Sequence, residues 1–435
     1  MAEPRVEPVE LIGVVGTGTM GAGIAQLALE AGHEVLIHDV DPAAIERGRG
    51  RIRAGLERRA RRLDLDPDTA EAWVDGRLSR LRAAATLDVL TEADPGVVIE
   101  AVLEDLAAKR AILRALDAGT WAEAILATNT SALSVEAIAR ATVQPARVLG
   151  LHFFNPAPVM PLVEVVVAPS TDPAVAERAT RLMIAWGKVT VHCADTPGFI
   201  VNRVNRPFTV EALAMLAAGH GSVASIDEAV RAAGYPMGPF ELMDLVGIDI
   251  NLAAAMGIFE RARSARDPLA ERFRPSSIQE RLVAAGRLGR KTGEGFYSYG
   301  PDGQAIGPAS GLASRPSVPP TPTEPIAPPP PESASSPATA IAERITLAIV
   351  NEAYRALGEG VATAADIDLA LRLGAGHPVG PFERAVGLGG TEAVVAALRR
   401  YATHGPRFEP APALVAGGPD VGGADPRHPG LDSGP

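Results

Sequence analysis

The chain has 435 residues with 41 basic and 52 acidic side chains, which gives a formal net charge of −11. A surface of this sign disfavours the phosphate backbone of nucleic acids, and the length predicts two or three folded units at about 150 residues each. The single cysteine, Cys193, excludes an intramolecular disulfide framework and multi-cysteine metal sites. We therefore expect a reducing, cytoplasmic location. No apolar run reaches the ~18 residues of a membrane span, so we expect a soluble protein without a membrane partner.

The first part of the chain alternates short apolar, β-branched runs with helical patterns. The runs are LIGVV, EVLIHD, VVIEAV, AILATN, VLGLHFF and VEVVVA. Helices are predicted over Thr19–Ala31, from the aspartate-proline start signal at Asp41, near Leu106–Leu116 and near Val135–Arg140. Buried strands that alternate with helices are typical of a doubly wound parallel sheet. We predict an α/β domain over residues 1–195.

The remainder of the chain divides by composition. After Pro197 the pattern is mostly helical, which predicts an all-α domain over 196–300. Residues 301–338 are rich in proline and read as an extended linker, and residues 404–435 alternate glycine and proline, which predicts a disordered tail. Metal ligation is not indicated anywhere along the chain.

An internal repeat lies on both sides of the linker. The segment SIDEAVRAAGYPMGPFE, which starts at Ser225, recurs as DIDLALRLGAGHPVGPFE from Asp366 with one extra residue. Matching residues at a constant offset point to duplication of a helical domain. Residues 339–403 are therefore predicted to form a shortened second helical copy. In this copy Glu343 stands where the first copy has Asn202.

A glycine-rich turn follows the first predicted strand and opens the first predicted helix. Its residues are Gly16, Thr17, Gly18, Thr19, Met20 and Gly21. In this pattern the glycines allow a tight turn, close approach of a pyrophosphate and close helix packing, and the helix N-terminus attracts the phosphates. Asp39 ends the next strand, where a carboxylate would accept hydrogen bonds from the adenosine ribose and repel a 2′-phosphate. These features predict a Rossmann-type domain that binds NAD rather than NADP.

A histidine and a glutamate in the second half of the sheet suggest acid–base chemistry. His152 follows a strand in GLHFFNP, and Glu164 lies in the apolar run LVEVVV, where a carboxylate is costly unless it is paired. A histidine held by a buried carboxylate is a general base fixed in tautomer and orientation. Ser131 in TNTSAL and Asn202 in PGFIVNR supply hydroxyl and amide groups. Each of these polar residues has a simpler alternative role as a core histidine or a helix cap.

Several motifs together resemble one known family. They are MGAGIAQ, EAVLEDLAAK, NTSAL, GLHFFNPAPVMPLVEVV, DTPGFIVNR, GYPMGPFELMD and GRKTGEGFY, in this order. The sequence is similar to the L-3-hydroxyacyl-CoA dehydrogenases over about residues 8–299, with a weaker match over 339–403. The resemblance implies NAD-dependent, reversible oxidation of the 3-hydroxyl group of an acyl-CoA. It implies further that the protein is either a homodimer or a pseudo-dimeric monomer through its two helical copies.

The same resemblance assigns roles to individual residues. It makes His152 the catalytic base, with Glu164 as its orienting carboxylate, and it places Ser131 and Asn202 at the reacting oxygen of the substrate. Arg62 falls where the family can contact the CoA nucleotide. The residues that it places near the nicotinamide and its ribose, in addition to Ser131, are Glu104, Lys109, Asn155 and Lys291.

Several functions stay open at this point. The substrate can be 3-hydroxybutyryl-CoA, a longer fatty acyl-CoA, or a dicarboxylic chain such as 3-hydroxyadipyl-CoA, in fatty-acid or aromatic-acid degradation. A catalytically silent NAD- or CoA-binding protein of the same fold is a second class. A Rossmann dehydrogenase that acts on a sugar or hydroxy acid without CoA is a third, although it would not explain the HFFNP and KTGEGFY motifs.

Overall fold

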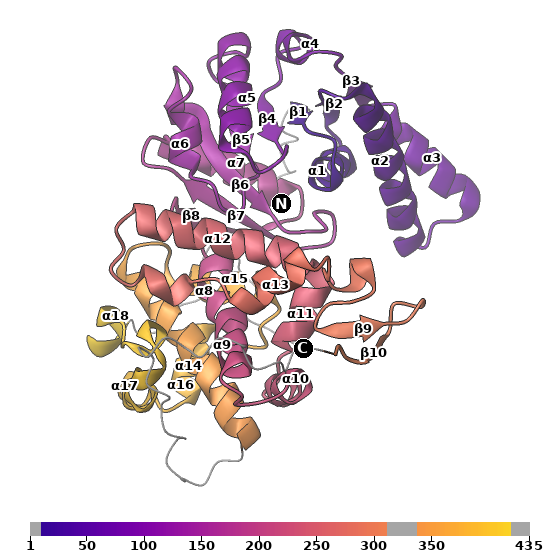
Figure 1. Cartoon of the computed structure of the whole chain (residues 1–435). Helices are drawn as coiled ribbons and strands as arrows, with labels where there is room; N and C mark the ends of the chain where they lie inside the picture. Colours follow the sequence, from indigo (N-terminus) through magenta and orange to yellow (C-terminus); the bar gives the residue numbers. More distant parts are fainter. Residues whose placement is uncertain (1–9, 311–336, 419–435) are drawn as a thin grey trace, which may run out of the picture. The chain divides into compact units, whose positions relative to one another are not determined.

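The computed structural model describes residues 10–310 and 337–418. The chain divides into two compact units, Met1–Phe199 and Ile200–Pro435. Each unit is considered by itself (Figure 1).

The first unit contains an eight-stranded sheet in the order β3-β2-β1-β4-β5-β6-β7-β8. Its strands are β1 (Leu11–Val15), β2 (Glu34–His38), β3 (Leu81–Ala83), β4 (Val97–Glu100), β5 (Ile125–Thr128), β6 (Val148–Phe153), β7 (Leu162–Val167) and β8 (Val189–Ala194). The order reverses at β1, as in a doubly wound fold. The predicted α/β class with a mainly parallel sheet is confirmed. The exception is the pair β6 and β7, which is antiparallel and was not predicted.

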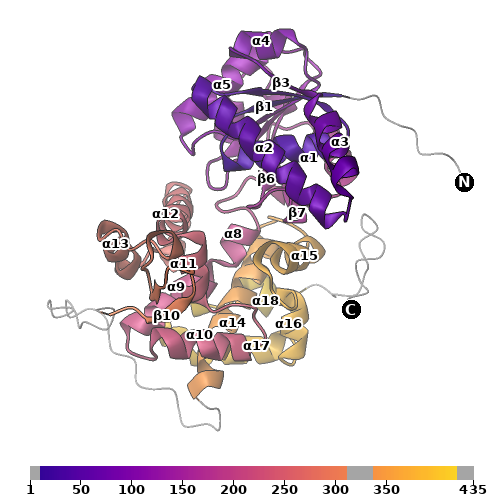
Figure 2. The ribbon, with the colours of Figure 1, turned by 90° about the vertical axis from the view of Figure 1, so that its right-hand side faces the viewer.

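Two layers of helices cover the sheet. The helices are α1 (Thr19–Glu30), α2 (Pro42–Arg62), α3 (Pro67–Leu78), α4 (Leu87–Glu92), α5 (Leu106–Gly119), α6 (Val135–Ala139) and α7 (Pro173–Ala185). Apolar side chains of α1, α2 and α7 form one core with the sheet, and those of α4, α5 and α6 form a separate core. Figures 1 and 2 show these two groups of helices, with α2 and α3 side by side.

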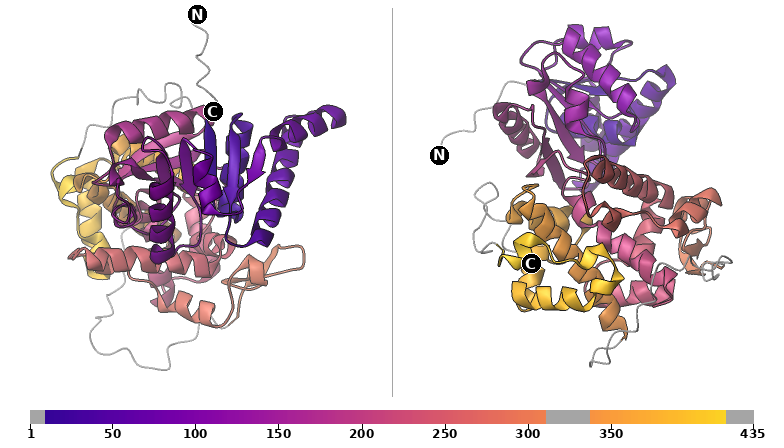
Figure 3. Two further views of the ribbon diagram at one scale, coloured as in Figure 1. Left: turned by 90° about the horizontal axis from the view of Figure 1, so that it is seen from above. Right: turned by 60° about the vertical axis from the view of Figure 1, so that its left-hand side comes forward.

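The second unit is mostly helical. Its helices are α8 (Val201–Val204), α9 (Arg206–Ala217), α10 (Val223–Ala232), α11 (Pro239–Val246), α12 (Ile248–Ser264), α13 (Ser277–Ala284), α14 (Pro337–Gly358), α15 (Ala364–Ala375), α16 (Pro381–Gly387), α17 (Thr391–Arg400) and α18 (Pro412–Val415). The long helix α14 packs against α9 and α10, and Figure 3 shows it in orange beside them. A two-stranded sheet pairs β9 (Tyr297–Tyr299) with β10 (Ala305–Pro308).

Among the described residues, no single helix has the length and apolar composition of a membrane span. The pair α11 and α12 meets that test only when the two helices are taken together, and they are bent by 101° at the break.

The repeated sequence adopts the same local structure on both sides of the proline-rich segment. Asp227 accepts hydrogen bonds from the backbone N–H groups of Phe240 and Glu241 at the start of α11. Asp368 accepts the equivalent bonds from the start of α16. A Cβ at Gly238 would lie 2.2 Å from the Asp227 carboxyl carbon, so glycine is needed where the chain passes this carboxylate.

The two copies exchange buried ion pairs. Glu352 of the second copy is buried and lies 2.8 Å from the Nε atoms of both Arg203 and Arg272 of the first copy. Burial would raise the pKa of Glu352, but the two arginines outweigh it and hold that pKa below its usual value. Glu352 therefore stays ionised and binds the copies together.

The reciprocal pair uses a residue from the predicted tail. Glu211 of the first copy contacts Arg344 and lies 2.8 Å from Nε of Arg407. The prediction of disorder from residue 404 is wrong for residues 404–418, because Phe408 and Leu414 are buried and α18 packs against α14. Residues 419–435 lie outside the described part of the chain.

The predicted linker also begins later than expected. Residues 305–308 form β10 and pair with the strand that ends at Tyr299, so the backbone there has hydrogen-bond partners despite its glycines and prolines. Most of the predicted linker, 311–336, lies outside the described residues, and α14 begins at Pro337.

A buried histidine lies where the two copies meet. Nε2 of His377 is 2.8 Å from Oδ1 of Asn205, and its ring packs edge-on against Tyr235, with centroids 5.1 Å apart. Burial, together with the smaller effect of the nearby positive charge of Arg384, lowers the pKa of His377 to about 4. The folded protein therefore keeps this imidazole neutral at pH 5 to 6.

We predict that His377 makes the protein less stable in mild acid. Between its folded pKa of about 4 and the ordinary value of 6.5, the unfolded chain binds the proton and the folded chain does not, so stability falls as the pH drops. The free energy of unfolding should lose about 2 kcal/mol from this group between pH 7 and pH 5. Urea denaturation of the wild type and His377→Gln measures the effect as the difference between their pH profiles, and identical profiles would contradict it.

Candidate active site

The glycine-rich turn has the geometry that a pyrophosphate requires. Gly16 has a φ of +95°, and a Cβ there would lie 2.7 Å from the carbonyl oxygen of Ala101. A Cβ at Gly21 would lie 1.8 Å from the carbonyl oxygen of Gly16, so α1 packs directly on the turn. A Cβ at Gly18 would meet no atom within 4 Å. The backbone at Gly18 is thus open to a ligand, and the chain fits NAD at the N-terminus of α1, where Thr19 and Met20 form the first turn.

Asp39 is fixed beside this turn. Its Oδ2 accepts hydrogen bonds from the backbone N–H and the hydroxyl of Thr17, at 2.8 and 3.1 Å. Its Oδ1 accepts a 3.2 Å bond from the N–H of Asp41. Thr17 is buried, so it orients Asp39 rather than offering its own N–H to a phosphate. The carboxylate lies at the C-terminal end of β2, where doubly wound sheets bind nucleotides.

The antiparallel pairing of β6 and β7 brings His152 and Glu164 together. The two residues are directly opposite each other in the register, which puts their Cβ atoms about 5 Å apart. Nδ1 of His152 lies 2.6 Å from Oε2 of Glu164, and Glu164 is fully buried. The ring of His152 packs against Phe154 and Phe199, with centroids 4.6 and 5.8 Å away. Because Nδ1 is engaged by the carboxylate, Nε2 is the nitrogen left to exchange a proton with a ligand.

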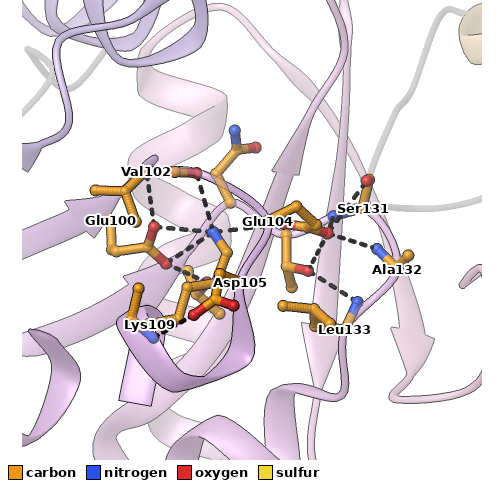
Figure 4. Close-up of polar contacts among 12 residues, drawn as sticks. Glu100, Val102, Glu104, Asp105, Lys109, Ser131, Ala132 and Leu133 are labelled. Carbon is orange, nitrogen blue, oxygen red and sulfur yellow. Dashed lines mark hydrogen bonds and ion pairs between the residues drawn. The ribbon is translucent and has the colours of Figure 1, made fainter. Parts of the chain in front are cut away.

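A buried lysine joins two glutamates at the end of β4 (Figure 4). Nζ of Lys109 lies 2.8 Å from Oε1 of Glu100 and 3.5 Å from Oε2 of Glu104. It also donates to the carbonyl oxygen of Val102. Lys109 is fully buried. Its ammonium is enclosed by protein groups and acts on Glu104, and the expected place of Lys109 near the nicotinamide and its ribose stays a prediction.

Glu104 in turn positions the loop that carries Ser131 (Figure 4). Its Oε1 accepts hydrogen bonds from the N–H of Ser131 at 2.8 Å, the N–H of Ala132 at 3.0 Å and the hydroxyl of Thr130 at 2.6 Å. Burial would raise the pKa of Glu104, but Lys109 and these hydrogen bonds outweigh it and hold that pKa below its usual value. Glu104 is therefore a carboxylate at neutral pH.

The other expected site residues lie elsewhere in the two units. Asn155 is exposed directly after the strand that holds His152, and its peptide bond to Pro156 is cis. Arg62 is exposed at the end of α2. Asn202 lies on α8 of the second unit. Lys291 is also in the second unit, where its Nζ lies 2.6 Å from Oδ1 of Asp249.

Sequence reasoning missed two buried charges that support the site. Glu100 anchors Lys109 and also accepts a 2.6 Å bond from the hydroxyl of Thr128. Nζ of Lys188 donates to the carbonyl oxygens of Ala157 and Met160, at 2.6 and 2.8 Å, and so holds the loop after Asn155. Burial lowers the pKa of Lys188 to about 8. The signal for Glu100 was available, because a carboxylate that ends the apolar run VVIE is costly unless it is paired.

Comparison with known proteins agrees with this geometry. A family model described as "3-hydroxyacyl-CoA dehydrogenase, NAD binding domain" matches residues 11–196. A second, "3-hydroxyacyl-CoA dehydrogenase, C-terminal domain", matches residues 198–299 and 341–416. The chain belongs to the 3-hydroxyacyl-CoA dehydrogenase family. The predicted family, oxidoreductase class and cofactor NAD are confirmed.

Named relatives differ in the substrate that their names give. A 3-hydroxyadipyl-CoA dehydrogenase of Escherichia coli is 43% identical over 299 residues, which are 68% of this chain and 61% of that protein. A 3-hydroxybutyryl-CoA dehydrogenase of Mycobacterium tuberculosis is 41% identical over 67% of this chain and 99% of its own length. The crystal structure of a 3-hydroxybutyryl-CoA dehydrogenase from E. coli has a TM-score of 0.77 at 32% identity and covers 94% of this chain and 98% of its own.

We predict that Glu164→Gln lowers kcat by about 10²–10⁴-fold, because the amide no longer fixes the imidazole in the tautomer that accepts a proton at Nε2. Initial rates of NADH oxidation with a 3-oxoacyl-CoA substrate measure the loss of kcat. The matched control is His192→Gln on β8, whose Nε2 lies 2.9 Å from the hydroxyl of Thr180. The control should keep kcat within a few-fold of wild type, whereas full turnover in Glu164→Gln would rule out its orienting role.

Proposed function

We propose that the protein oxidises short-chain (S)-3-hydroxyacyl-CoA to 3-oxoacyl-CoA, reversibly and with NAD. The observation that carries this proposal is the 2.6 Å contact between His152 and a fully buried Glu164 across two paired strands. A buried carboxylate on Nδ1 makes Nε2 a positioned general base. An inert protein of the same fold would have no need for this arrangement.

Each polar group has a separate task in the proposed reaction. In the oxidation, Nε2 of His152 takes the proton of the 3-hydroxyl group, and Glu164 stabilises the resulting imidazolium. In the reverse direction the protonated ring returns that proton to the developing alkoxide. When bound at the N-terminus of α1, NAD would supply the acceptor for the hydride that leaves C3. Ser131 and Asn202 are proposed to hydrogen-bond the reacting oxygen. Glu104 fixes the loop of Ser131, because it accepts hydrogen bonds from the backbone N–H groups of Ser131 and Ala132.

The length of the acyl chain is part of the proposal. Relatives at comparable identity are named for a four-carbon substrate, 3-hydroxybutyryl-CoA, and for a six-carbon dicarboxylic one, 3-hydroxyadipyl-CoA. C3 has the same position relative to the thioester in both, so the same base can serve either substrate. We therefore expect a short-chain enzyme of fatty-acid or aromatic-acid degradation in the cytoplasm.

We predict a preference for NADH over NADPH of about 10²-fold or more in kcat/KM, because a 2′-phosphate would be placed against the Asp39 carboxylate and like charges in contact cost several kcal/mol. The assay follows cofactor oxidation with 3-oxoacyl-CoA substrates of four to sixteen carbons. Short chains should be the best substrates, and Asp39→Ser should narrow the cofactor preference. Equal efficiency with both cofactors would contradict the role of Asp39, and absence of turnover with every chain length would refute the proposed function.

We also propose that the second helical copy takes the place of a dimer partner for the first. The support is the exchange of ion pairs, in which Glu352 is held by arginines of the first copy and Glu211 by arginines of the second. Such reciprocity is typical of an isologous two-fold interface. The full chain is then a pseudo-dimeric monomer.

We predict that deletion of residues 331–435 exposes the apolar surface that α14 covers on α9 and α10. The truncated chain should dimerise or aggregate, whereas the full chain sediments as a monomer. Analytical ultracentrifugation of both proteins at matched concentration tests this. A truncated chain that stays monodisperse and monomeric would exclude the partner role.

A further inference from the structure

Arg206 is a buried cation that the fold does not compensate. It is 6% exposed at the start of α9. Its Nη1 makes one long hydrogen bond, 3.4 Å, to Oδ1 of Asn251. Its Nε is fully buried without a hydrogen-bond partner. Within residues 10–310 and 337–418, no carboxylate lies at ion-pair distance from its guanidinium.

The other buried arginines of the helical unit are treated differently. Arg203 and Arg272 share Glu352, and Arg344 contacts Glu211. The Nε of Arg355 also lacks a hydrogen-bond partner, but its Nη2 donates to the carbonyl oxygen of Glu409, and the negative charges of Glu352 and Glu359 act on it. Removing an ion from water costs several kcal/mol, which a protein normally offsets with an opposite charge. Burial lowers the pKa of Arg206 to about 10, so this group is still a cation at neutral pH.

The position of Arg206 relates it to the proposed substrate residue Asn202. The two are four residues apart, and the backbone between them stays helical, since the N–H of Asn205 bonds to the carbonyl oxygen of Val201 at 3.0 Å. Residues at this spacing lie on one face of a helix, a little more than one turn or about 6 Å apart along its axis. The unpaired guanidinium is thus about one helical turn away from the amide proposed to bind the oxygen on C3.

Arg206 is also part of a polar cluster. Oδ1 of Asn251, on α12, accepts a second bond from Nε2 of Gln279, at 2.9 Å, and Gln279 is buried on α13. The second contact of Gln279 Nε2 is the sulfur of Met243. Neutral amides can orient a guanidinium but cannot neutralise it. Among the residues that the structure describes, this cluster contains no anion.

We propose that Arg206 binds the terminal carboxylate of a dicarboxylic 3-hydroxyacyl-CoA, in which that carboxylate is the sixth carbon of the chain. The inference rests on the proposed function and names its substrate class. Three C–C bonds separate C3 from C6 and span about 4 Å when extended, and the hydrogen bond at each end lengthens this reach, so the chain can bridge two residues about 6 Å apart along one helix. A planar guanidinium binds a carboxylate through two parallel hydrogen bonds. Bound substrate thereby supplies the missing negative charge.

If Arg206 serves to bind a ligand, its unpaired buried charge should lower the stability of the ligand-free protein. Arg206→Met removes an uncompensated buried charge and keeps most of the side-chain volume, so the ligand-free variant should melt at the same or a higher temperature than wild type. An arginine needed only for folding would give the opposite result. The matched control is Arg355→Met, a buried arginine that has a backbone partner and should lose stability.

The decisive experiment compares two chains of equal length in the full-length enzyme. Initial rates of NADH oxidation are measured with 3-oxoadipyl-CoA, which has the terminal carboxylate, and with 3-oxohexanoyl-CoA, which lacks it. Wild type should favour 3-oxoadipyl-CoA by at least tenfold in kcat/KM. Arg206→Met should lose about 10²-fold with 3-oxoadipyl-CoA and stay within about threefold with 3-oxohexanoyl-CoA. Arg355→Met should leave the ratio of the two substrates unchanged.

Binding provides a readout that does not need turnover. Isothermal titration with adipyl-CoA and hexanoyl-CoA should show tighter binding of adipyl-CoA to wild type, and Arg206→Met should remove the difference. If Arg206→Met fails to fold, Arg206→Lys keeps the charge without the bidentate geometry and should weaken the response to adipyl-CoA alone.

The inference is overturned if wild type does not discriminate between the two chains, or if Arg206 variants affect both chains equally. Turnover of 3-oxohexanoyl-CoA without such discrimination would refute the role of Arg206 and leave the proposed function intact. Loss of turnover with both chains in wild type would refute the proposed function, and the titrations would still decide whether Arg206 recognises a carboxylate.

Discussion

A charge that is removed from water must meet an opposite charge or a full set of hydrogen bonds, and this requirement organises both units. In the sheet domain it pairs Glu164 with His152, which yields a base held in one tautomer. It also fixes Lys109 between two carboxylates. In the helical unit the same requirement pairs Glu352 of the second copy with two arginines of the first copy, and Glu211 of the first copy with Arg344 of the second. The same requirement makes an unpaired guanidinium informative.

These compensated charges link stability to function in different ways. The ion pairs of the helical unit are complete without any ligand, so they contribute to the fold at all times. The cluster around Lys109 is also fully paired without a ligand. Its outermost carboxylate, Glu104, accepts a hydrogen bond from the backbone of Ser131, so the buried cluster holds the loop that carries a proposed substrate contact. Arg206 has no opposite charge beside it among the described residues, so a bound anion would lower the free-energy cost of burying its guanidinium.

Much of the site could be predicted from the sequence because single residues contradicted their surroundings. Glu164 in an apolar run required a partner, and the glycine-rich turn with Asp39 required a nucleotide. The antiparallel turn between β6 and β7 could not be predicted, since fully buried strands read as the same apolar run in either direction. The partner of Lys109 could not be predicted either, because spacing along the chain does not reveal that its ammonium turns back to Glu100. The ordered structure around Phe408 could not be predicted, because its few buried apolar residues stand in a segment dominated by glycine and proline.

The contact between Tyr235 and His377 has a consequence for how this protein can evolve. The two residues occupy equivalent positions in the repeated segments GYPMGPF and GHPVGPF, and they pack against each other. In a homodimer any substitution beside the axis appears on both sides at once. When both halves belong to one chain, each half mutates alone. The second half carries Glu343 in place of the amide at Asn202, and it uses that glutamate to bind Arg400 and Tyr401. In the proposed pseudo-dimeric arrangement, covalent fusion thus lets one half lose the amide proposed to contact substrate while the other half keeps it.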